Sequence, residues 1–464
     1  MRFTRRSLDP RAYTALLALA GASLITSVTT SCSSSDDRPM SENDGGEGSA
    51  DAASDGALED DVVDAGTDDV ALVDAALVDA SPLPIACEAA PCALALSTPL
   101  PSGTGAREEG FCALLTDGTV ACWGANNAGQ LGIPDVAQSA SAVRVPGLSD
   151  ITHLDRTCAV DGDGAVWCWG RGPFLQSDAS ATTVQTSPVR LALPGPANKV
   201  AVSEWVGCAI LRDASVVCWG TNATLQVSAV LSTSAANTQP HAIDLAASAK
   251  DIAVAYGASR GATFTTHEDG TLSSWGTAPT VGRPTPLTAD GWPSPVALEH
   301  VTMVSTSGEE ACAVANGVGW CWGAADARST FDIPSAQLRG TPRAVDMPEP
   351  ITRIATTQSY FVTNDYVTSV EKRRWCATTT SGDVYCWGLN NMGQAGDGTK
   401  EFALSAVRVQ GLPAPAAEVK VMPYSTCALL TSGKVYCWGN NAHGQLGSTT
   451  PTLSVSVPRE VVLP

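Results

Sequence analysis

One recurring segment limits what this chain can fold into more than any other feature. The sequence CALLTSGKVYCWGNNAHGQLG (427–447) occurs earlier, almost unchanged, as CALLTDGTVACWGANNAGQLG (112–132). Copies at roughly 50-residue intervals are typical of a repeat architecture, so the repeat decides the fold class. Weaker copies begin at Cys158, Cys208, Cys312 and Cys376, and a seventh, without cysteines, begins at Phe264.

Each copy has the pattern of a β-hairpin. In the first, FCALL and VACWG flank Thr116–Gly118, a turn in which Gly118 would take the left-handed conformation. This register places Cys112 opposite Cys122, close enough for a disulfide. The same reasoning predicts the pairs Cys158–Cys168, Cys208–Cys218, Cys312–Cys321, Cys376–Cys386 and Cys427–Cys437.

Variations between the copies support this register. The fifth copy is one residue shorter, and its Asn316-Gly317 turn would keep the two cysteines opposite each other. In the fourth copy both cysteine positions change together, to Phe264 and Ser274. Paired retention and paired loss favour disulfides over buried free thiols. In the third copy Ala214 stands where the turn glycine is expected, which predicts strain or a different turn.

The N-terminus has the pattern of an export signal. In residues 1–31 several arginines precede an apolar run, and Thr29–Cys32 resembles a bacterial lipoprotein processing site. We therefore expect an exported, membrane-anchored protein of the cell envelope with a lipid on Cys32. The chain has 15 cysteines. If Cys87 also pairs with Cys92, only Cys32 is left over, as lipidation requires. No zinc-site spacing is present, so no metal is expected.

An acidic tract follows the signal. Residues 33–82 hold 15 acidic residues and one basic residue, and the whole chain has a net charge of −20. Such a composition does not form a core, so residues 32–84 are predicted to be a disordered linker ahead of a domain at 85–464. Acidity also argues against nucleic acid as a partner.

The copies are predicted to close into a ring. A short Val-rich strand signal, such as Ala142–Val145, precedes most of the later hairpins, and a spare one (457–463) ends the chain. We expect this last strand to complete the first sheet. Seven short sheets would then form a closed all-β seven-bladed β-propeller without a long open edge.

The order of these elements resembles the regulator of chromosome condensation repeat. The resemblance covers about residues 85–464 and is most specific in the first, sixth and seventh copies. It implies a seven-bladed β-propeller in which tails such as Asn126–Gly132 pack neighbouring blades together.

Candidate contact residues lie in the loops that enter the Cys strands. These loops vary while the strands stay constant, as in scaffolds that carry recognition. The sixth copy holds an insertion of about 18 residues, rich in aromatic and arginine side chains, which are common anchors of protein interfaces. The predicted partner-binding residues are Tyr360, Phe361, Tyr366, Arg373, Arg374, Trp375, Trp205 and Tyr424.

These observations favour a monomeric, non-enzymatic scaffold that binds a protein through one face and needs no cofactor. A secreted bacterial member of the resembling family inhibits a β-lactamase, so inhibition of a secreted enzyme is one expectation. A second reading is exchange-factor-like binding of a small GTPase, as for the family's nuclear founder. A third is an envelope lyase or glycosidase using Glu108, Glu109, Glu309 and Glu310, although units one and five are not adjacent.

Overall fold

The computed structural model describes residues 78–87, 89–100, 109–175, 182–235, 238–256, 260–323, 339–357, 360–364, 367–371, 374–448 and 453–464. The predicted signal peptide, Cys32 and most of the acidic tract lie outside these residues. Across the described ranges all the regular elements are β-strands. In that part of the chain no helix has the length and apolarity needed to span a membrane.

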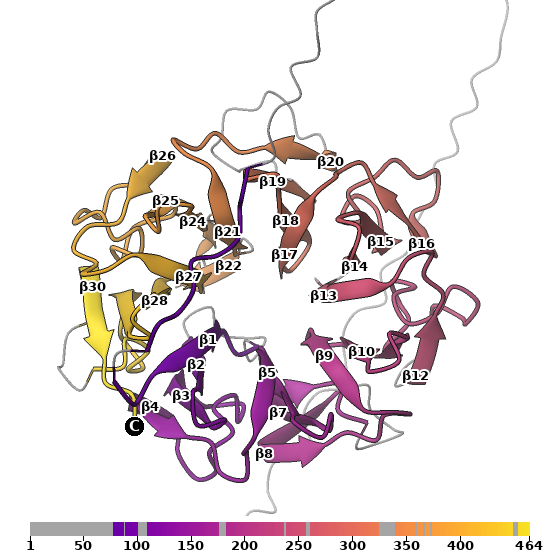
Figure 1. Cartoon of the computed structure of the whole chain (residues 1–464), viewed down its shortest axis with the longest axis horizontal. Helices are drawn as coiled ribbons and strands as arrows, with labels where there is room; N and C mark the ends of the chain where they lie inside the picture. The colour runs from indigo at the N-terminus through magenta and orange to yellow at the C-terminus, as the bar shows by residue number, and fades with distance from the viewer. Residues whose placement is uncertain are drawn as a thin grey trace, which may run out of the picture. The chain divides into compact units, whose positions relative to one another are not determined.

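Seven four-stranded antiparallel sheets stand around a central axis (Figure 1), so the chain from residue 78 onward is a seven-bladed β-propeller. The first three blades are β1 (Ala93–Ser97), β2 (Gly110–Leu115), β3 (Val120–Ala125) and β4 (Gln138–Arg144); β5 (Ile151–Asp155), β6 (Cys158–Asp161), β7 (Val166–Gly172) and β8 (Thr183–Arg190); and β9 (Ala197–Val202), β10 (Val206–Leu211), β11 (Val216–Gly220) and β12 (Thr238–Ile243). The fourth and fifth are β13 (Ala249–Tyr256), β14 (Gly261–His267), β15 (Leu272–Thr277) and β16 (Ala289–Val296); and β17 (Val301–Ser307), β18 (Glu310–Ala315), β19 (Val318–Gly323) and β20 (Arg339–Ala344). The sixth and seventh are β21 (Ile351–Thr356), β24 (Arg374–Thr379), β25 (Val384–Gly388) and β26 (Ala403–Arg408); and β27 (Ala416–Val421), β28 (Ser425–Leu430), β29 (Val435–Asn440) and β30 (Ser454–Val461).

The C-terminal strand corrects one prediction. β30 pairs with β29, with Cys437 opposite Arg459, and so belongs to the seventh blade. The first blade is already complete with β1 to β4. Each outer strand hydrogen-bonds to the hairpin that comes before it, as Val143 does opposite Cys122. The expectation that the last strand completes the first sheet is therefore wrong, and every blade is one continuous stretch of chain.

Among the described residues, a tryptophan side chain joins six of the blades to the blade before it. The indole N–H of Trp169 donates to the carbonyl of Gln130 at 3.0 Å, and that of Trp438 to the carbonyl of Gln394 at 2.9 Å. Trp123 makes the same contact with Gln445, at 3.1 Å, between the first and seventh blades. This contact closes the ring without strand exchange. Trp219, Trp275 and Trp322 donate in the same way to the carbonyls of Pro173, Gln226 and Thr280.

The loops that offer these carbonyls are shaped by a buried asparagine. The side-chain oxygen of Asn126 accepts the N–H of Leu131 at 2.8 Å, and Asn390 accepts that of Ala395 at 2.8 Å. Asn222 holds the loop of the third blade in the same way, with Val227 as donor. Because the acceptor is a backbone atom, blades without the motif still offer it.

An extended segment, residues 78–87 and 89–92, lies along the fifth, sixth and seventh blades before it enters β1; Figure 1 shows it in indigo, passing β21 and β27. We call it the strap. Val78 N–H donates to the Asn316 side chain at 2.9 Å, and Ala86 N–H to the Thr431 carbonyl at 2.7 Å. Ala80 is buried in a hydrophobic cluster formed by the fifth, sixth and seventh blades. The described segment therefore begins ahead of the domain boundary that the sequence predicted at residue 84.

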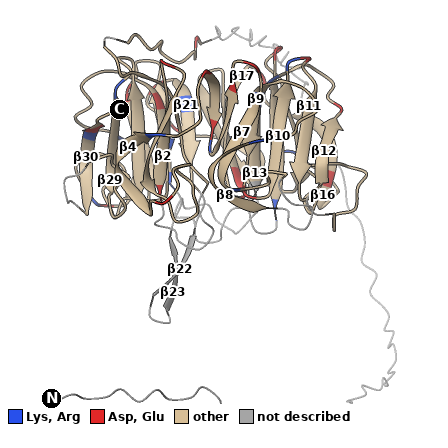
Figure 2. Cartoon of the chain, turned by 90° about the horizontal axis from the view of Figure 1, so that it is seen from below, with Lys and Arg blue, Asp and Glu red and all other residues tan. Residues whose placement is uncertain are grey.

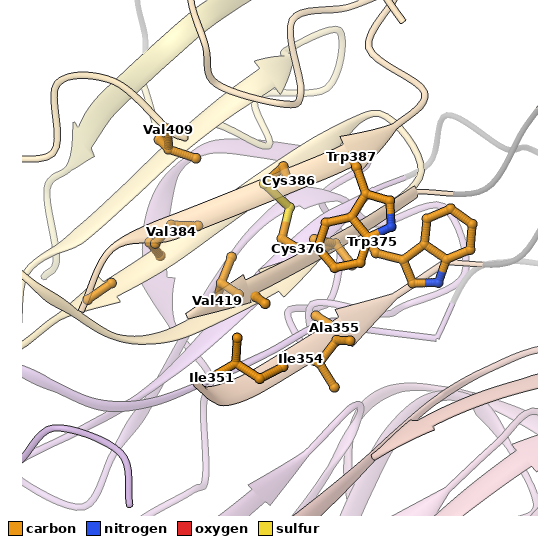
Figure 3. Packing of buried hydrophobic residues seen from close by; sticks show 14 of the residues in the cluster. Ile351, Ile354, Ala355, Trp375, Cys376, Val384, Cys386, Trp387, Val409 and Val419 are labelled. Carbon is orange, nitrogen blue, oxygen red and sulfur yellow. A yellow bond between two sulfur atoms is a disulfide. The ribbon is translucent and has the colours of Figure 1, made fainter. Parts of the chain in front are cut away.

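The predicted cysteine register is confirmed. Cys112 pairs with Cys122 across β2 and β3 with a Cα–Cα distance of 4.1 Å, and all six hairpin disulfides and Cys87–Cys92 are present. Phe264 faces Ser274 in the fourth blade. Ala214 keeps the turn but takes a φ of 67°, so the strain predicted at this position is present. The hydrophobic core lies between neighbouring sheets; Figure 3 shows the Cys376–Cys386 disulfide within it, beside Trp387.

Candidate functional site

A polar channel runs through the centre of the ring. Its cavity of about 350 Å³ is lined by the inner strands of all seven blades, β1, β5, β9, β13, β17, β21 and β27. Each inner strand carries a β-bulge at the same place in its pairing, which bends the strand and re-aims the next side chain. The residues that follow the bulges line the channel and are Ala95, His153, Lys199, Asp251, Met303, Arg353 and Glu418.

Oppositely charged residues face one another in this layer. Lys199 Nζ lies 3.8 Å from Asp251 Oδ1, and Lys420 Nζ lies 3.0 Å from Glu418 Oε1. Glu418 also accepts the N–H of Leu96 at 2.9 Å. Burial acts to raise the pKa of Glu418, but Lys420 and Arg353 outweigh it and hold the pKa below its usual value. The carboxylate is therefore ionised at neutral pH.

One mouth of the channel is bridged by an arginine. Arg156, in the turn between β5 and β6, donates from Nη2 to the carbonyl of Thr306 in the fifth blade at 2.8 Å. The hydroxyl of Ser97 in turn donates to the Arg156 carbonyl at 3.1 Å. Arg156 holds a positive φ of 50° to reach this position. These contacts narrow the opening on the side of the loops that enter the Cys strands.

Two buried charged residues, Glu109 and Arg374, connect the first, sixth and seventh blades near the same loops. Glu109 is 1% exposed and accepts hydrogen bonds from Tyr424 N–H and Ser425 Oγ, both at 2.6 Å. Burial raises the pKa of Glu109 to about 7. Arg374 is also 1% exposed and donates to the carbonyls of Met422 and Gln394, each at 2.7 Å. Burial lowers the pKa of Arg374 to about 9, and Glu109 opposes this shift.

Three predicted contact residues are corrected by this geometry. Arg374, Trp375 and Tyr424 are buried, at 1%, 8% and 1% exposure, so their predicted place at a partner surface is wrong. Arg374 is already the first residue of β24, and its side chain joins two blades. The Trp375 indole donates to Glu310 Oε1 at 3.1 Å and stacks on Trp387, with ring centroids 6.0 Å apart (Figure 3).

The other predicted contact residues have different positions. Trp205 is half-buried against the core between the third and fourth blades. Tyr360 and Phe361 lie in β22 (Tyr360–Asn364), which pairs with β23 (Val367–Glu371) as a separate two-stranded sheet. Tyr366 and Arg373 lie outside the described residues. The insertion thus contains a β-hairpin of its own, which the sequence pattern had not predicted.

The acidic residues considered for hydrolytic chemistry do not form a solvent-facing pair in the described part. Glu109 and Glu310 are buried, at 1% and 4% exposure, and Glu309 binds Arg260 at 3.4 Å. Glu108 lies outside the described residues. The charged channel was missed because the loop between each inner strand and its Cys strand varies in length. The sequence does contain a usable pattern: each of these channel-lining residues stands two positions after the first apolar residue of its inner strand.

The comparison with protein families agrees with the ring geometry. The model described as "Regulator of chromosome condensation (RCC1) repeat" matches residues 110–130, 376–394 and 423–445, in the first, sixth and seventh blades. These three blades carry RCC1 repeats. Solved structures with the same fold include the following two. Human WBSCR16 has a TM-score of 0.59 at 16% identity, covering 75% of this chain and 95% of that one. Yeast RCC1 (Prp20), solved bound to Kap60, has a TM-score of 0.58 at 16% identity, covering 74% and 83%.

Curated relatives match this chain over short stretches. The mouse RCC1-like G exchanging factor-like protein is 36% identical over 83 residues, 18% of each chain. The zebrafish E3 ubiquitin-protein ligase MYCBP2 is 39% identical over 67 residues, 14% of this chain and 2% of that one. The chain thus spans only 2% to 18% of the length of these two relatives.

Proposed function

We propose that this protein is an exported, non-enzymatic scaffold that binds a protein partner, with the β22–β23 hairpin as its main contact element. The observation that carries this proposal is the independence of the hairpin from the ring. β21 pairs directly with β24, with Thr356 opposite Trp375, as if nothing intervened. β22 and β23 pair with each other and with no other described strand. An insertion that the ring does not need for its own hydrogen bonds is available for recognition.

Protein binding also has precedent among the similar structures. Yeast Prp20, which shares the fold, was solved with Kap60 bound. Propeller loops tolerate variation because the sheets carry the stability, so partners can differ between members while the ring persists. We propose no catalytic step.

Export is supported by the cysteines. Seven disulfides hold the described ring, and disulfides persist mainly outside reducing compartments. Together with the signal pattern of residues 1–31, this supports an envelope protein tethered by a lipid on Cys32 and an acidic linker. Metabolic labelling with a palmitate analogue tests the anchor: label should appear on the wild type and be absent from Cys32→Ala.

A deletion designed from the ring geometry tests the hairpin. Thr357 and Arg374 lie opposite each other, with the Arg374 N–H donating to Thr357 Oγ1 at 3.2 Å. Residues 358–373 can therefore be replaced by Asn-Gly, which forms a two-residue turn. We expect the shortened chain to fold with its disulfides intact. Its affinity for a partner captured from cell-envelope extract and then purified should fall by at least about tenfold.

The matched control changes an exposed aromatic residue elsewhere on the ring. Trp292→Ser alters a side chain that is 57% exposed on β16, and it should leave the affinity unchanged. Unchanged binding after the hairpin replacement would refute the role of the hairpin. Failure to recover any protein that binds the purified wild-type ring directly would refute the scaffold itself.

A second candidate is exchange-factor-like binding of a small GTPase, favoured by the similarity to the mouse exchanging factor-like protein. It predicts that the chain accelerates release of a fluorescent guanine nucleotide from the GTPase it binds. A partner that is not a GTPase would exclude it.

A further inference from the structure

The central channel holds charges that the ring leaves partly exposed or without a hydrogen bond. The side chains of Lys199 and Asp251 are 37% and 42% exposed although both lie inside the ring. Their separation of 3.8 Å is longer than a hydrogen bond. Among the described residues, Arg353 Nε is shielded from solvent and has no hydrogen-bond partner. An enclosed arginine nitrogen is normally hydrogen-bonded, and exposed charges inside a cavity can reach a bound molecule, so these groups indicate a ligand site.

The two signs of charge are balanced along the channel. Its lining contains four cationic and four anionic side chains, namely Arg156, Lys199, Arg353, Lys420 and Asp155, Glu204, Asp251, Glu418. Burial and Lys199 together lower the pKa of His153, the other titratable group of this layer, which is therefore neutral at neutral pH. A ligand of one sign would leave a group of the opposite sign without a partner, and an unpaired charge in a confined site is costly.

The size and layout of the channel select a small ligand. A cavity of about 350 Å³ lies at the lower end of the range for small-molecule sites, and the Arg156–Thr306 bridge narrows one mouth. Around the ring, Met303 of the fifth blade lies between Asp251 of the fourth and Arg353 of the sixth. An anionic group, an apolar group and a cationic group thus follow one another on the wall.

We propose that the channel binds a small zwitterion of the amino-acid class, either a free amino acid or a dipeptide. Its ammonium group binds Asp251, its carboxylate binds Arg353, and its carbon chain packs along Met303. This site is independent of the hairpin and of any protein partner.

The test uses the full oxidised chain and isothermal titration calorimetry against a panel of amino acids and dipeptides. Each compound is matched with two analogues, one acetylated at the amine and one amidated at the carboxylate. At least one free zwitterion should bind, and each blocked analogue should bind at least about tenfold more weakly. Comparing amino acids with dipeptides decides between the two sources of this chemistry.

Variants assign the site to the named residues. Arg353→Gln and Asp251→Asn should each weaken binding at least about tenfold, whereas Lys250→Gln, an exposed change on the same strand β13 and outside the channel lining, should not. The proposal is overturned if no zwitterion binds at millimolar concentrations, or if a blocked analogue binds as well as its parent. The second criterion uses only wild-type protein, so it holds even if a variant fails to fold.

Discussion

The indole N–H of Trp123 and the carbonyl of Gln445 meet at 3.1 Å, although 322 residues separate them in the chain. This hydrogen bond joins the first blade to the last, and it has the same geometry as the contacts between successive blades. The ring is therefore sealed by a copy of its ordinary blade-to-blade contact. In the side view of Figure 2 the strands carry few charged residues, in keeping with sheets that pack face to face.

Removing the closing hydrogen bond should weaken the ring. Trp123→Phe keeps an aromatic ring in the core but leaves the buried Gln445 carbonyl unpaired, which costs about 1–3 kcal/mol. Because the seam is an ordinary contact, Trp169→Phe should cost a similar amount. Urea unfolding measures both. A loss at Trp123 several times larger than at Trp169 would show that the seam is a distinct structure.

The strap should stabilise the ring through its own disulfide. Cys87 and Cys92 enclose a short loop that sits against Gly433 of the seventh blade. Replacing both cysteines with serine should lower the free energy of unfolding by about 2 kcal/mol. The substitution should also make residues 78–92 easier to cleave in limited proteolysis, with the cleavage sites identified by mass spectrometry. Unchanged protection of this segment would mean that the hydrogen bonds of Val78 and Ala86 hold it without the disulfide.

Glu109 should make stability depend on pH. Its pKa in the folded protein, about 7, lies above the ordinary value of 4.5, so the folded state binds a proton more tightly than the unfolded state. Protonation of Glu109 therefore adds to the free energy of unfolding below pH 4.5. This added stability is lost as the pH rises through 7, a change on the order of 3 kcal/mol. Glu109→Gln stays neutral and should lack this change.

Comparing the wild type with Glu109→Gln separates the titration of Glu109 from that of the other carboxylates. Melting temperatures are measured for wild type and Glu109→Gln between pH 5 and pH 8. As the pH rises, the melting temperature of the variant should increase relative to that of the wild type. A difference that is constant across this range would show that Glu109 does not titrate there.

A glycine in the turn of the third blade should make the protein more stable. Ala214 holds a φ of 67°, a region that costs an L-residue but not glycine. Ala214→Gly should therefore raise the free energy of unfolding by about 0.5–1 kcal/mol, although glycine's greater freedom in the unfolded chain offsets part of the gain. The reverse change at the corresponding turn, Gly433→Ala, should destabilise the ring, because the added Cβ would strike Cys92. A lower melting temperature for Ala214→Gly, or a higher one for Gly433→Ala, would contradict this account.

The sequence was sufficient to predict the blades but not their boundaries. Copied hairpins fix the register, so Cys112 had to face Cys122, and Phe264 had to face Ser274. An outer strand, in contrast, lies between two hairpins and its composition suits either neighbour. Only the hydrogen bonds show that Arg459 pairs with Cys437. The last strand was therefore placed in the wrong blade.

The contact residues were harder to predict because a few positions separate a loop from a strand. Arg374 and Trp375 were read as part of the insertion, yet β24 already begins at Arg374. An arginine and a tryptophan beside a variable loop look like an interface, whereas here the guanidinium is enclosed by carbonyls of its own blade and the next. Exposure of such a side chain depends on neighbours distant in the chain, which local patterns do not report.

The strap has a consequence for how the molecule is made. Its first hydrogen bond joins Val78 to Asn316, 238 residues further on. During synthesis the strap therefore leaves the ribosome long before the surface that receives it exists, whereas each blade can form as soon as its own stretch has emerged. Docking of the strap belongs to the end of assembly, so a chain with an undocked strap is an immature form that a protease or chaperone can distinguish from the finished ring.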